Sequence, residues 1–414
     1  MAILTRSEFL RLGLGASAGW CLGRADARAQ DAARLTRVAG IISEFDAQGI
    51  HRTATDVDQR TGRWLADQAA RAGADARLET FSLNRVDVRA AFVEAEGRRA
   101  EGLPFFDGGF TDAQGVTARI GPPDVGFPIA LVVLDSAGIS SEGRSLDALR
   151  RSALHRGIIA VTDGAHPGLS PSNAGEFAAP FGLPVLQVGT DDHLWLRDLT
   201  ARGLPVRFVS DAARTRAEAS NVVATIAGRQ PGLPPLVVMT PRSGWFHCAS
   251  ERGGGLACWL EAIRAVSAAK LPRTVVAVAS SGHELGHYGL DAFLAARPGL
   301  VKSAAAWIHL GANIGAAGGV PRLQASDDAI EAMAVSALDK AGAAVRQRVP
   351  RGTRPGGEAR NIHDGGGRYV SMLGSGPFFH NIEDRWPASV DVGAVARFSE
   401  AFAALAVVLA RASY

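Results

Sequence analysis

The chain has 414 residues, 47% of them hydrophobic and 21% charged, so it can bury a large core divided over two or three domains. Its 48 glycines and 20 prolines follow no repeat, which excludes fibrous and collagen-like classes. The formal net charge is only +3 and no long run of like charge occurs, which argues against a nucleic-acid partner.

Residues 1–29 predict an export signal. They combine a basic start, a degenerate twin-arginine motif (TRSEFLR), a short apolar stretch over 12–22 and an Ala-Arg-Ala cleavage site. The mature chain would then begin near Gln30 and be periplasmic or extracellular. The apolar stretch is too short to cross a bilayer, so we expect no membrane span in the mature form. The alternative is an ordinary buried N-terminal helix. Cys248 and Cys258 remain in the mature chain and are expected to be free thiols.

Residues 30–85 predict the N-terminal part of the main domain, helical over 31–73 and strand-like over 76–83 and 86–95. The sequence pattern changes over 86–211, where short strand-like and helix-like segments separated by prolines and glycines predict an inserted small domain. We expect it to lie beside the main domain and supply no metal ligand. Its expected strands are 128–136, 158–164 and 183–189, and its expected helices are 145–157 and 190–199.

Residues 212–414 predict the rest of the main domain. Strands are expected over 221–228, 235–240, 273–281 and 304–310, and helices over 253–269, 284–297, 327–342 and 392–411. Apolar strands alternating with amphipathic helices predict an α/β fold, with a mostly parallel sheet covered by helices on both faces. Ligands of such sheets bind beyond the carboxyl ends of the strands. Glu251, His283, Glu284 and His309 are polar residues at or just after those ends.

His283 to His287 reads His-Glu-Leu-Gly-His, which matches the zinc-protease pattern H-E-x-x-H. That pattern needs both histidines on one face of an established helix and a third ligand farther along. Here a β-branched stretch ending in serines and a glycine precedes His283, so this histidine lies where a strand gives way to a helix. No glutamate follows between His287 and Glu331. We therefore disfavour the reading in which both histidines are ligands and Glu284 is the base.

The segments SNVVATIAG, ERGGGLACWLEAIRAV, RTVVAVASSGHELGHYGL, AAAWIHLGANIG and GPFFHNIEDRW occur in an order and spacing that resemble metallopeptidase family twenty-eight. These zinc exopeptidases include aminopeptidase Y and glutamate carboxypeptidase-like proteins. The resemblance covers nearly the whole mature chain, and residues 86–211 resemble the protease-associated domain that many members carry. It implies a zinc exopeptidase-like fold and a peptide or small amide substrate.

The same resemblance implies metal ligands, although two of the family's ligand-site residues are replaced. Pro241 and Ser243 stand where the family has a His-x-Asp pair. The ligands implied for one zinc ion are Glu251, Glu284 and His380, while a second ion would keep only His309 and a share of Glu251. We therefore predict one zinc ion, because two carboxylates and an imidazole form a plausible catalytic set.

His283 replaces the glutamate that is the family's general base, and we predict that it takes this role, since an imidazole can accept a proton from metal-bound water. The alternative is a polar supporting residue. His287 is expected to support the site without binding metal, and Asp384 to orient His380. His247, in the loop before Glu251, is a further candidate ligand.

The leading functional prediction is an exported metal-dependent hydrolase of peptides or small amides, aminopeptidase-like. One alternative is a catalytically inactive pseudo-peptidase that acts as a binding module. Another is acyl transfer on a single zinc, as in the glutaminyl cyclases, which the resemblance places on the same fold. The sequence does not predict an oligomeric state.

Overall fold

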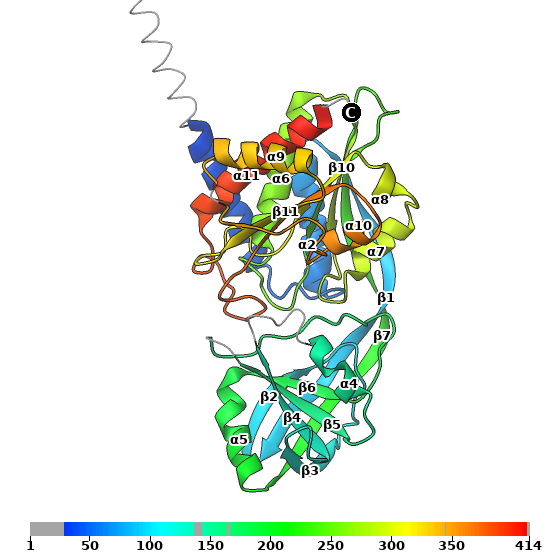
Figure 1. Ribbon diagram of the computed structural model, residues 1–414, viewed down its shortest axis with the longest axis vertical. Coiled ribbons are helices and arrows are strands. Elements are labelled where there is room, and N and C mark those ends of the chain that lie inside the picture. The colour runs from blue at the N-terminus through cyan, green and yellow to red at the C-terminus, as the bar shows by residue number, and fades with distance from the viewer. Residues whose placement is uncertain (1–28, 136–142, 164–165, 344, 412–414) are drawn as a thin grey trace, which may run out of the picture.

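The computed structural model describes residues 29–135, 143–163, 166–343 and 345–411, so residues 1–28 of the predicted export signal lie outside the described part. The chain forms two lobes joined by β1 (Asp75–Ala95) and β7 (Pro205–Ile226), long antiparallel strands that run from one lobe into the other (Figure 1). The predicted domain boundaries at 86 and 211 fall inside these two strands. The lobes are therefore connected by a continuous two-stranded ribbon.

The larger lobe is an α/β sandwich. It begins with a helix over residues 29–47. Its elements are α2 (Asp56–Arg71), β8 (Leu236–Pro241), α6 (Gly253–Ala269), β9 (Val275–Ser280), α7 (Tyr288–Ala295), α8 (Leu300–Ser303), β10 (Ala306–Leu310), β11 (Pro321–Ala325), α9 (Asp328–Lys340), β12 (Gln347–Arg348), α10 (Ala359–Asp364), β13 (Tyr369–Gly374) and α11 (Val392–Arg411).

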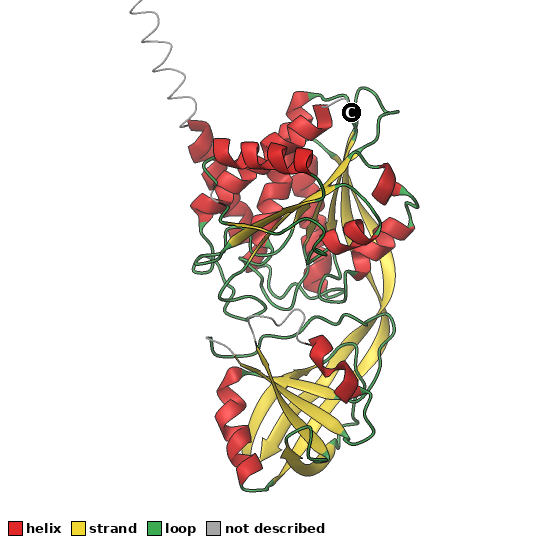
Figure 2. Cartoon of the chain, in the orientation of Figure 1, coloured by secondary structure: helices red, strands yellow, loops and turns green. Residues whose placement is uncertain are grey.

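The sheet of this lobe runs in the order β7-β9-β8-β10-β13-β11-β12. Strands β9, β8, β10 and β13 are parallel, whereas β7 and β11 pair antiparallel at either side of them. The predicted α/β class with helices on both faces is confirmed, and the sheet is mixed around a parallel centre. The carboxyl ends of the parallel strands lie along the edge that faces the smaller lobe (Figure 2).

The sheet is covered on both faces because its strands are apolar throughout. Alternate residues, such as Val238 and Ile308, pack with the 29–47 helix, α2, α6, α9 and α11 on one face. Their neighbours Val237 and Trp307 pack with α7, α8 and α10 on the other. Side chains of successive strand residues point to opposite faces, so a strand buried on both sides must be apolar at every position.

The smaller lobe is a closed ring of strands. It contains β2 (Arg98–Pro104), β3 (Val116–Gly121), β4 (Ile129–Asp135), β5 (Gly157–Asp163) and β6 (Val185–Val188), with α4 (Asp147–Arg150) and α5 (His193–Ala201). The order β1-β2-β6-β5-β4-β3-β7 closes on itself because the far ends of β1 and β7 also pair. Whether this lobe is a protease-associated domain stays a prediction.

Two predicted helices are shorter than expected. The helix predicted over 284–297 begins only at Tyr288, because Gly286 and His287 have left-handed backbone conformations (φ 73° and 71°) that interrupt a helix. The helix predicted over 145–157 ends at Arg150. The carbonyl of Arg150 accepts a hydrogen bond from Leu183 N instead of continuing the helix.

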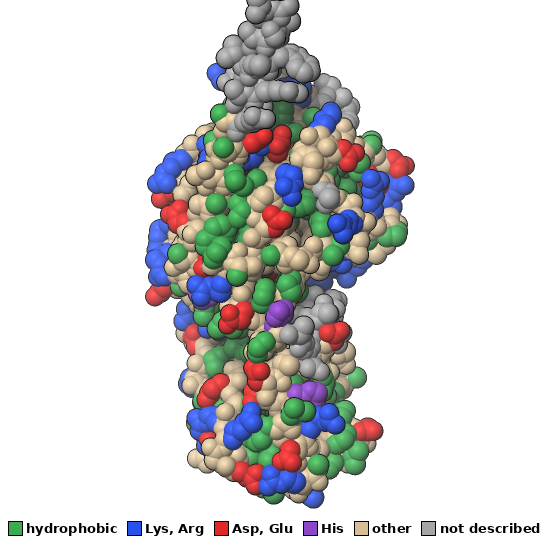
Figure 3. All heavy atoms as spheres, turned by 90° about the vertical axis from the view of Figure 1, so that its left-hand side faces the viewer, with side chains coloured by type: hydrophobic (Ala, Val, Ile, Leu, Met, Phe, Trp, Pro, Cys, Tyr) green, Lys and Arg blue, Asp and Glu red, His purple; other side chains and the backbone are tan. Residues whose placement is uncertain are grey.

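Cys248 and Cys258 are buried free thiols, as predicted. Among the described helices, α11 is long and apolar enough to cross a membrane by length and composition. It packs against α6 and α9, and Phe402 and Leu405 on its inner side are buried in the core. Figure 3 shows basic and acidic side chains interspersed over the described residues of one face of both lobes.

Candidate metal centre

A cavity of about 1200 Å³ lies between the carboxyl edge of the large sheet and the smaller lobe. The larger lobe contributes His283, His287 and Asn361 to its wall, and the smaller lobe contributes Asp107 and Asn173. A ligand here would contact both lobes. The position agrees with the rule that α/β sheets bind ligands beyond the carboxyl ends of their strands.

Three histidines converge on one carboxylate at this edge. Glu358, in the loop before α10, lies with Oε1 2.7 Å from His283 Nδ1 and with Oε2 3.3 Å from His309 Nε2. His309, in β10, is held by Ser371 Oγ in β13, 2.8 Å from its Nδ1. His287 lies beside His283, with ring centroids 5.2 Å apart. All four of these ionisable side chains are buried.

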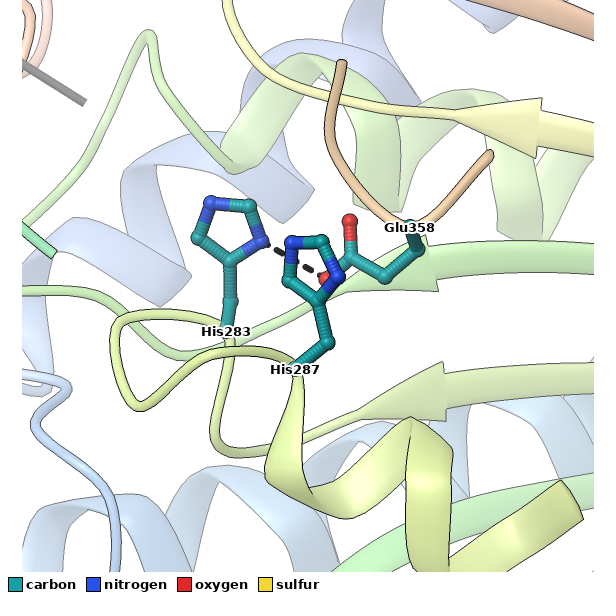
Figure 4. A group of neighbouring side chains, drawn as sticks. All are labelled: His283, His287 and Glu358. Atoms are coloured by element: carbon teal, nitrogen blue, oxygen red, sulfur yellow. Dashed lines mark hydrogen bonds and ion pairs between the residues drawn. The ribbon is translucent and has the colours of Figure 1, made fainter. Parts of the chain in front are cut away.

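His283, His287 and Glu358 each offer a ligand atom within 4.8 Å of the others (Figure 4). In the described part of the chain this is the only group of three or more His, Cys, Asp or Glu side chains that is so arranged. Asn361 Oδ1 lies 2.8 Å from His287 Nδ1 and accepts a hydrogen bond from it, which leaves Nε2 as the ligand atom. Two imidazoles and one carboxylate suit zinc.

The charge states of this group also suit a metal ion. Burial lowers the pKa of His283 to about 4, helped by the nearby charge of Arg252, and burial likewise lowers the pKa of His287. Burial alone would raise the pKa of Glu358, but positive charge on His283 and His287 and hydrogen bonds from His283 and His309 hold it well below its ordinary value. Above the pKa values of all three groups the imidazoles are neutral and the carboxylate is ionised, which are the forms that bind metal.

Glu251 and His380 form a separate pair. Glu251 lies between β8 and α6, and its Oε1 is 3.3 Å from His380 Nε2 in the loop after β13. Arg252 is inserted beside them, with Nη2 2.6 Å from Glu251 Oε1. Burial by itself raises the pKa of Glu251, yet the charges of Arg252 and His380 outweigh burial and bring it to about 2. A fixed side-chain cation thus already compensates this carboxylate, and the roles of Glu251 and His380 as metal ligands stay predictions.

Glu284 lies in neither group. Its Oε1 accepts a hydrogen bond from Thr53 N at 2.7 Å and its Oε2 one from Ser243 Oγ at 2.7 Å. Burial raises its pKa. Within the described residues, the set of Glu251, Glu284 and His380 is therefore not assembled around one point, because Glu284 is directed to the segment that precedes α2. Its role as a metal ligand stays a prediction.

Asp384 supports the backbone of Glu251 and not the ring of His380. Its carboxylate accepts hydrogen bonds from Ser250 N at 2.8 Å and Glu251 N at 2.9 Å. The partner of His380 is the carbonyl of Pro171 in the smaller lobe, 2.7 Å from Nδ1. Asp384 was expected to orient His380, and in the structure it supports Ser250 and Glu251. The smaller lobe, expected only to lie alongside, orients a predicted ligand.

Sequence reasoning missed Glu358 and Arg252. The signal for Glu358 was weak: two glycines precede it, and Gly357 has φ 59° with its Cα against the His309 ring, where a Cβ would lie 3.0 Å from Cε1. Arg252 was visible as a basic residue at the start of a glycine-rich helix. His247 is half-buried and lies outside the three-residue group.

Comparisons with known proteins place the fold. No protein-family model and no curated protein matches the chain. Solved structures do match: a zinc aminopeptidase from Bacillus subtilis (TM-score 0.71, 15% identity, 89% of this chain and 94% of that one) and a Peptidase M28 precursor from Shewanella amazonensis SB2B (0.74, 15%, 93% and 97%). The chain has the zinc aminopeptidase fold. An aminopeptidase from Aneurinibacillus sp. strain AM-1 matches similarly (0.66, 13%, 92% and 94%).

This aminopeptidase fold extends over both lobes, since the matched structures are covered almost end to end. At 13–15% identity the likeness shows the fold, and the chemistry has to be argued from the side chains of this chain.

Proposed function

We propose that the protein is an exported, metal-dependent hydrolase of peptides or small amides, aminopeptidase-like, that uses one zinc ion. The observation that carries the proposal is the group of His283, His287 and Glu358 on the wall of the cavity, within an aminopeptidase fold. Binding without catalysis and acyl transfer on one zinc are the competing functions.

The ligands of this ion would be His283, His287 and Glu358. Each is buried, and each is in the charge state that binds metal, as argued above. His309 lies next to Glu358 and keeps that carboxylate in place through the 3.3 Å contact. Such outer partners of a ligand fix its orientation. In this proposal His283 is a ligand, and the base role assigned to it from the sequence is given up.

A zinc ion held by these residues would supply Lewis-acid chemistry for hydrolysis of an amide. Asn361 fixes the His287 ring through Nδ1 and donates from Nδ2 to Asp291 Oδ1 at 2.6 Å. Asp291, an exposed residue that lines the cavity, thereby holds Asn361 and, through it, the ring of His287.

The smaller lobe limits the substrate. The segment over 171–174 is tied to the larger lobe, with Ala174 N donating to the Glu284 carbonyl at 2.8 Å and Trp245 Nε1 donating to Asn173 Oδ1 at 3.0 Å. This segment closes one side of a cavity only somewhat larger than the roughly 300–1000 Å³ of small-molecule pockets. The closed side supports short peptides or small amides as substrates.

Hydrolysis is tested on purified mature protein with a panel of aminoacyl 4-nitroanilides and dipeptides. We expect release of the amino-terminal residue, loss of activity after chelation and recovery with one equivalent of Zn²⁺. Conversion of an amino-terminal glutamine to its cyclic form without hydrolysis would favour acyl transfer. Tight binding of a peptide without formation of any product in the presence of Zn²⁺ would favour a binding module.

Export is expected to remove residues 1–29. The basic start, apolar stretch and Ala-Arg-Ala site occur in the order that a signal peptidase recognises. N-terminal sequencing of the protein from its native host should give a first residue near Gln30. A protein that keeps Met1 and stays in the cytoplasm would refute export while leaving the proposed chemistry in place.

A further inference from the structure

Arg252 is a fully buried arginine in an unusual place. Its side chain is 0% exposed and it occupies the N-cap of α6, where it makes no side-chain capping bond. The positive end of a helix dipole favours anions and disfavours a cation. Helix stability therefore does not explain an arginine here. Its Nε donates to the carbonyl of Ser243 at 2.7 Å, which aims the guanidinium at Glu251.

The polar groups beside Arg252 lack hydrogen-bond partners. His380 Nδ1 donates to the Pro171 carbonyl, and its Nε2 faces Glu251 Oε1, 3.3 Å away. Both Glu251 oxygens and His380 Nε2 are buried and have no hydrogen-bond partner. A buried carboxylate without hydrogen bonds needs a positive charge beside it.

Arg252 supplies that cation without forming an ordinary hydrogen-bonded pair. Nη2 is 2.6 Å from Glu251 Oε1, but the groups are not aligned for a hydrogen bond, and Nη1 and Nη2 both have no hydrogen-bond partner. The attraction is one of charge, without the directional bonds usual for arginine. A metal ion at this position would likewise compensate the charge of Glu251.

Arg242 shows the contrast. It is also 0% exposed and also lies 2.6 Å from a carboxylate, that of Asp58. Its Nη1 donates to Asp58 Oδ1 and to the Asp58 carbonyl, and its Nη2 to the Ser220 carbonyl. Arg242 is thus hydrogen-bonded to its carboxylate, whereas Arg252 is a cation beside buried polar atoms that have no hydrogen-bond partner.

We propose that the Arg252 guanidinium takes the place of a metal ion between Glu251 and His380, closing a latent metal site there. As a consequence, metal binding within the described part of the chain is confined to His283, His287 and Glu358; this second statement rests on the proposed function, the first does not. Removing the cation should let the same acceptors bind Zn²⁺.

The test measures zinc per chain on full-length protein by elemental analysis after incubation with Zn²⁺ and removal of the excess. Arg252→Met should bind one zinc ion more than wild type. The double variant Arg252→Met/His380→Ala should return to the wild-type content. Arg242→Met, which also removes a buried cation from a carboxylate, should gain no zinc. Zn²⁺ should also raise the unfolding temperature of Arg252→Met by several degrees more than that of wild type.

The difference in zinc per chain between Arg252→Met and wild type decides the outcome, whatever the zinc content of wild type is. A wild type without zinc would refute the proposed function, yet a gain of one ion on Arg252→Met would still support the latent site. No gain, or a gain that persists in the double variant, would overturn it. If Arg252→Met does not fold, His380→Ala alone still tests it: loss of zinc from that variant would show that wild type binds metal at His380 beside Arg252.

Discussion

His287→Ala is expected to lose zinc, with affinity reduced by roughly 100-fold or more, because a site with three protein ligands has little redundancy and even lost outer partners cost 10–100-fold. Amide hydrolysis should fall with it. Glu358→Gln should have the same effect, since it removes the only carboxylate of the group. Titration calorimetry with Zn²⁺ on the chelator-treated protein measures the change.

Glu284→Gln is the matched control. It alters a buried glutamate next to His283, but the carboxyl group of Glu284 is held by Thr53 N and Ser243 Oγ and lies outside the three-residue group. Its zinc affinity should stay near that of wild type. The family resemblance leads to the reverse expectation, with Glu284 essential and His287 dispensable. Zinc lost from Glu284→Gln and kept by His287→Ala would restore that ligand set and refute ours.

Arg242→Met is expected to destabilise the protein by about 3–5 kcal/mol, because it leaves a buried carboxylate without its counter-charge. Asp58 and Arg242 are both 0% exposed, and Nη1 lies 2.6 Å from Oδ1. Asp58 also accepts hydrogen bonds from Ala54 N and from Ser281 Oγ. The pair thereby joins the start of α2 to the ends of β8 and β9, and chemical denaturation measures its contribution.

The control for this pair is the exposed ion pair of Arg98 and Asp192 at 2.9 Å. Arg98→Met should change stability much less, because solvent and salt screen an exposed pair. The double variant Asp58→Leu/Arg242→Met should recover part of the loss, since no charge then remains buried. Equal effects of Arg242→Met and Arg98→Met would show that the buried pair has no special importance.

The sequence predicted the architecture because the positions of strands and helices follow from local patterns of apolar and polar residues. Apolar runs such as Val275–Ser280 and amphipathic runs such as 253–269 have the periods of strands and helices, and their alternation allows few arrangements other than a covered sheet. It also predicted that polar side chains gather at this edge, since His283 follows the end of β9 and His309 lies at the end of β10, with β8 alone between these strands. Even so, the left-handed turn at Gly286 and His287 shortened a helix that the pattern had extended through them.

Which side chains meet was decided by the tertiary structure alone. Glu358 is 75 residues from His283, and its place beside the histidines depends on how the loop before α10 packs over β10. Arg252 follows Glu251 directly, yet whether it points to solvent or to that carboxylate is set by the carbonyl of Ser243. A residue's type and spacing specify its local conformation. Its partners depend on contacts between distant segments.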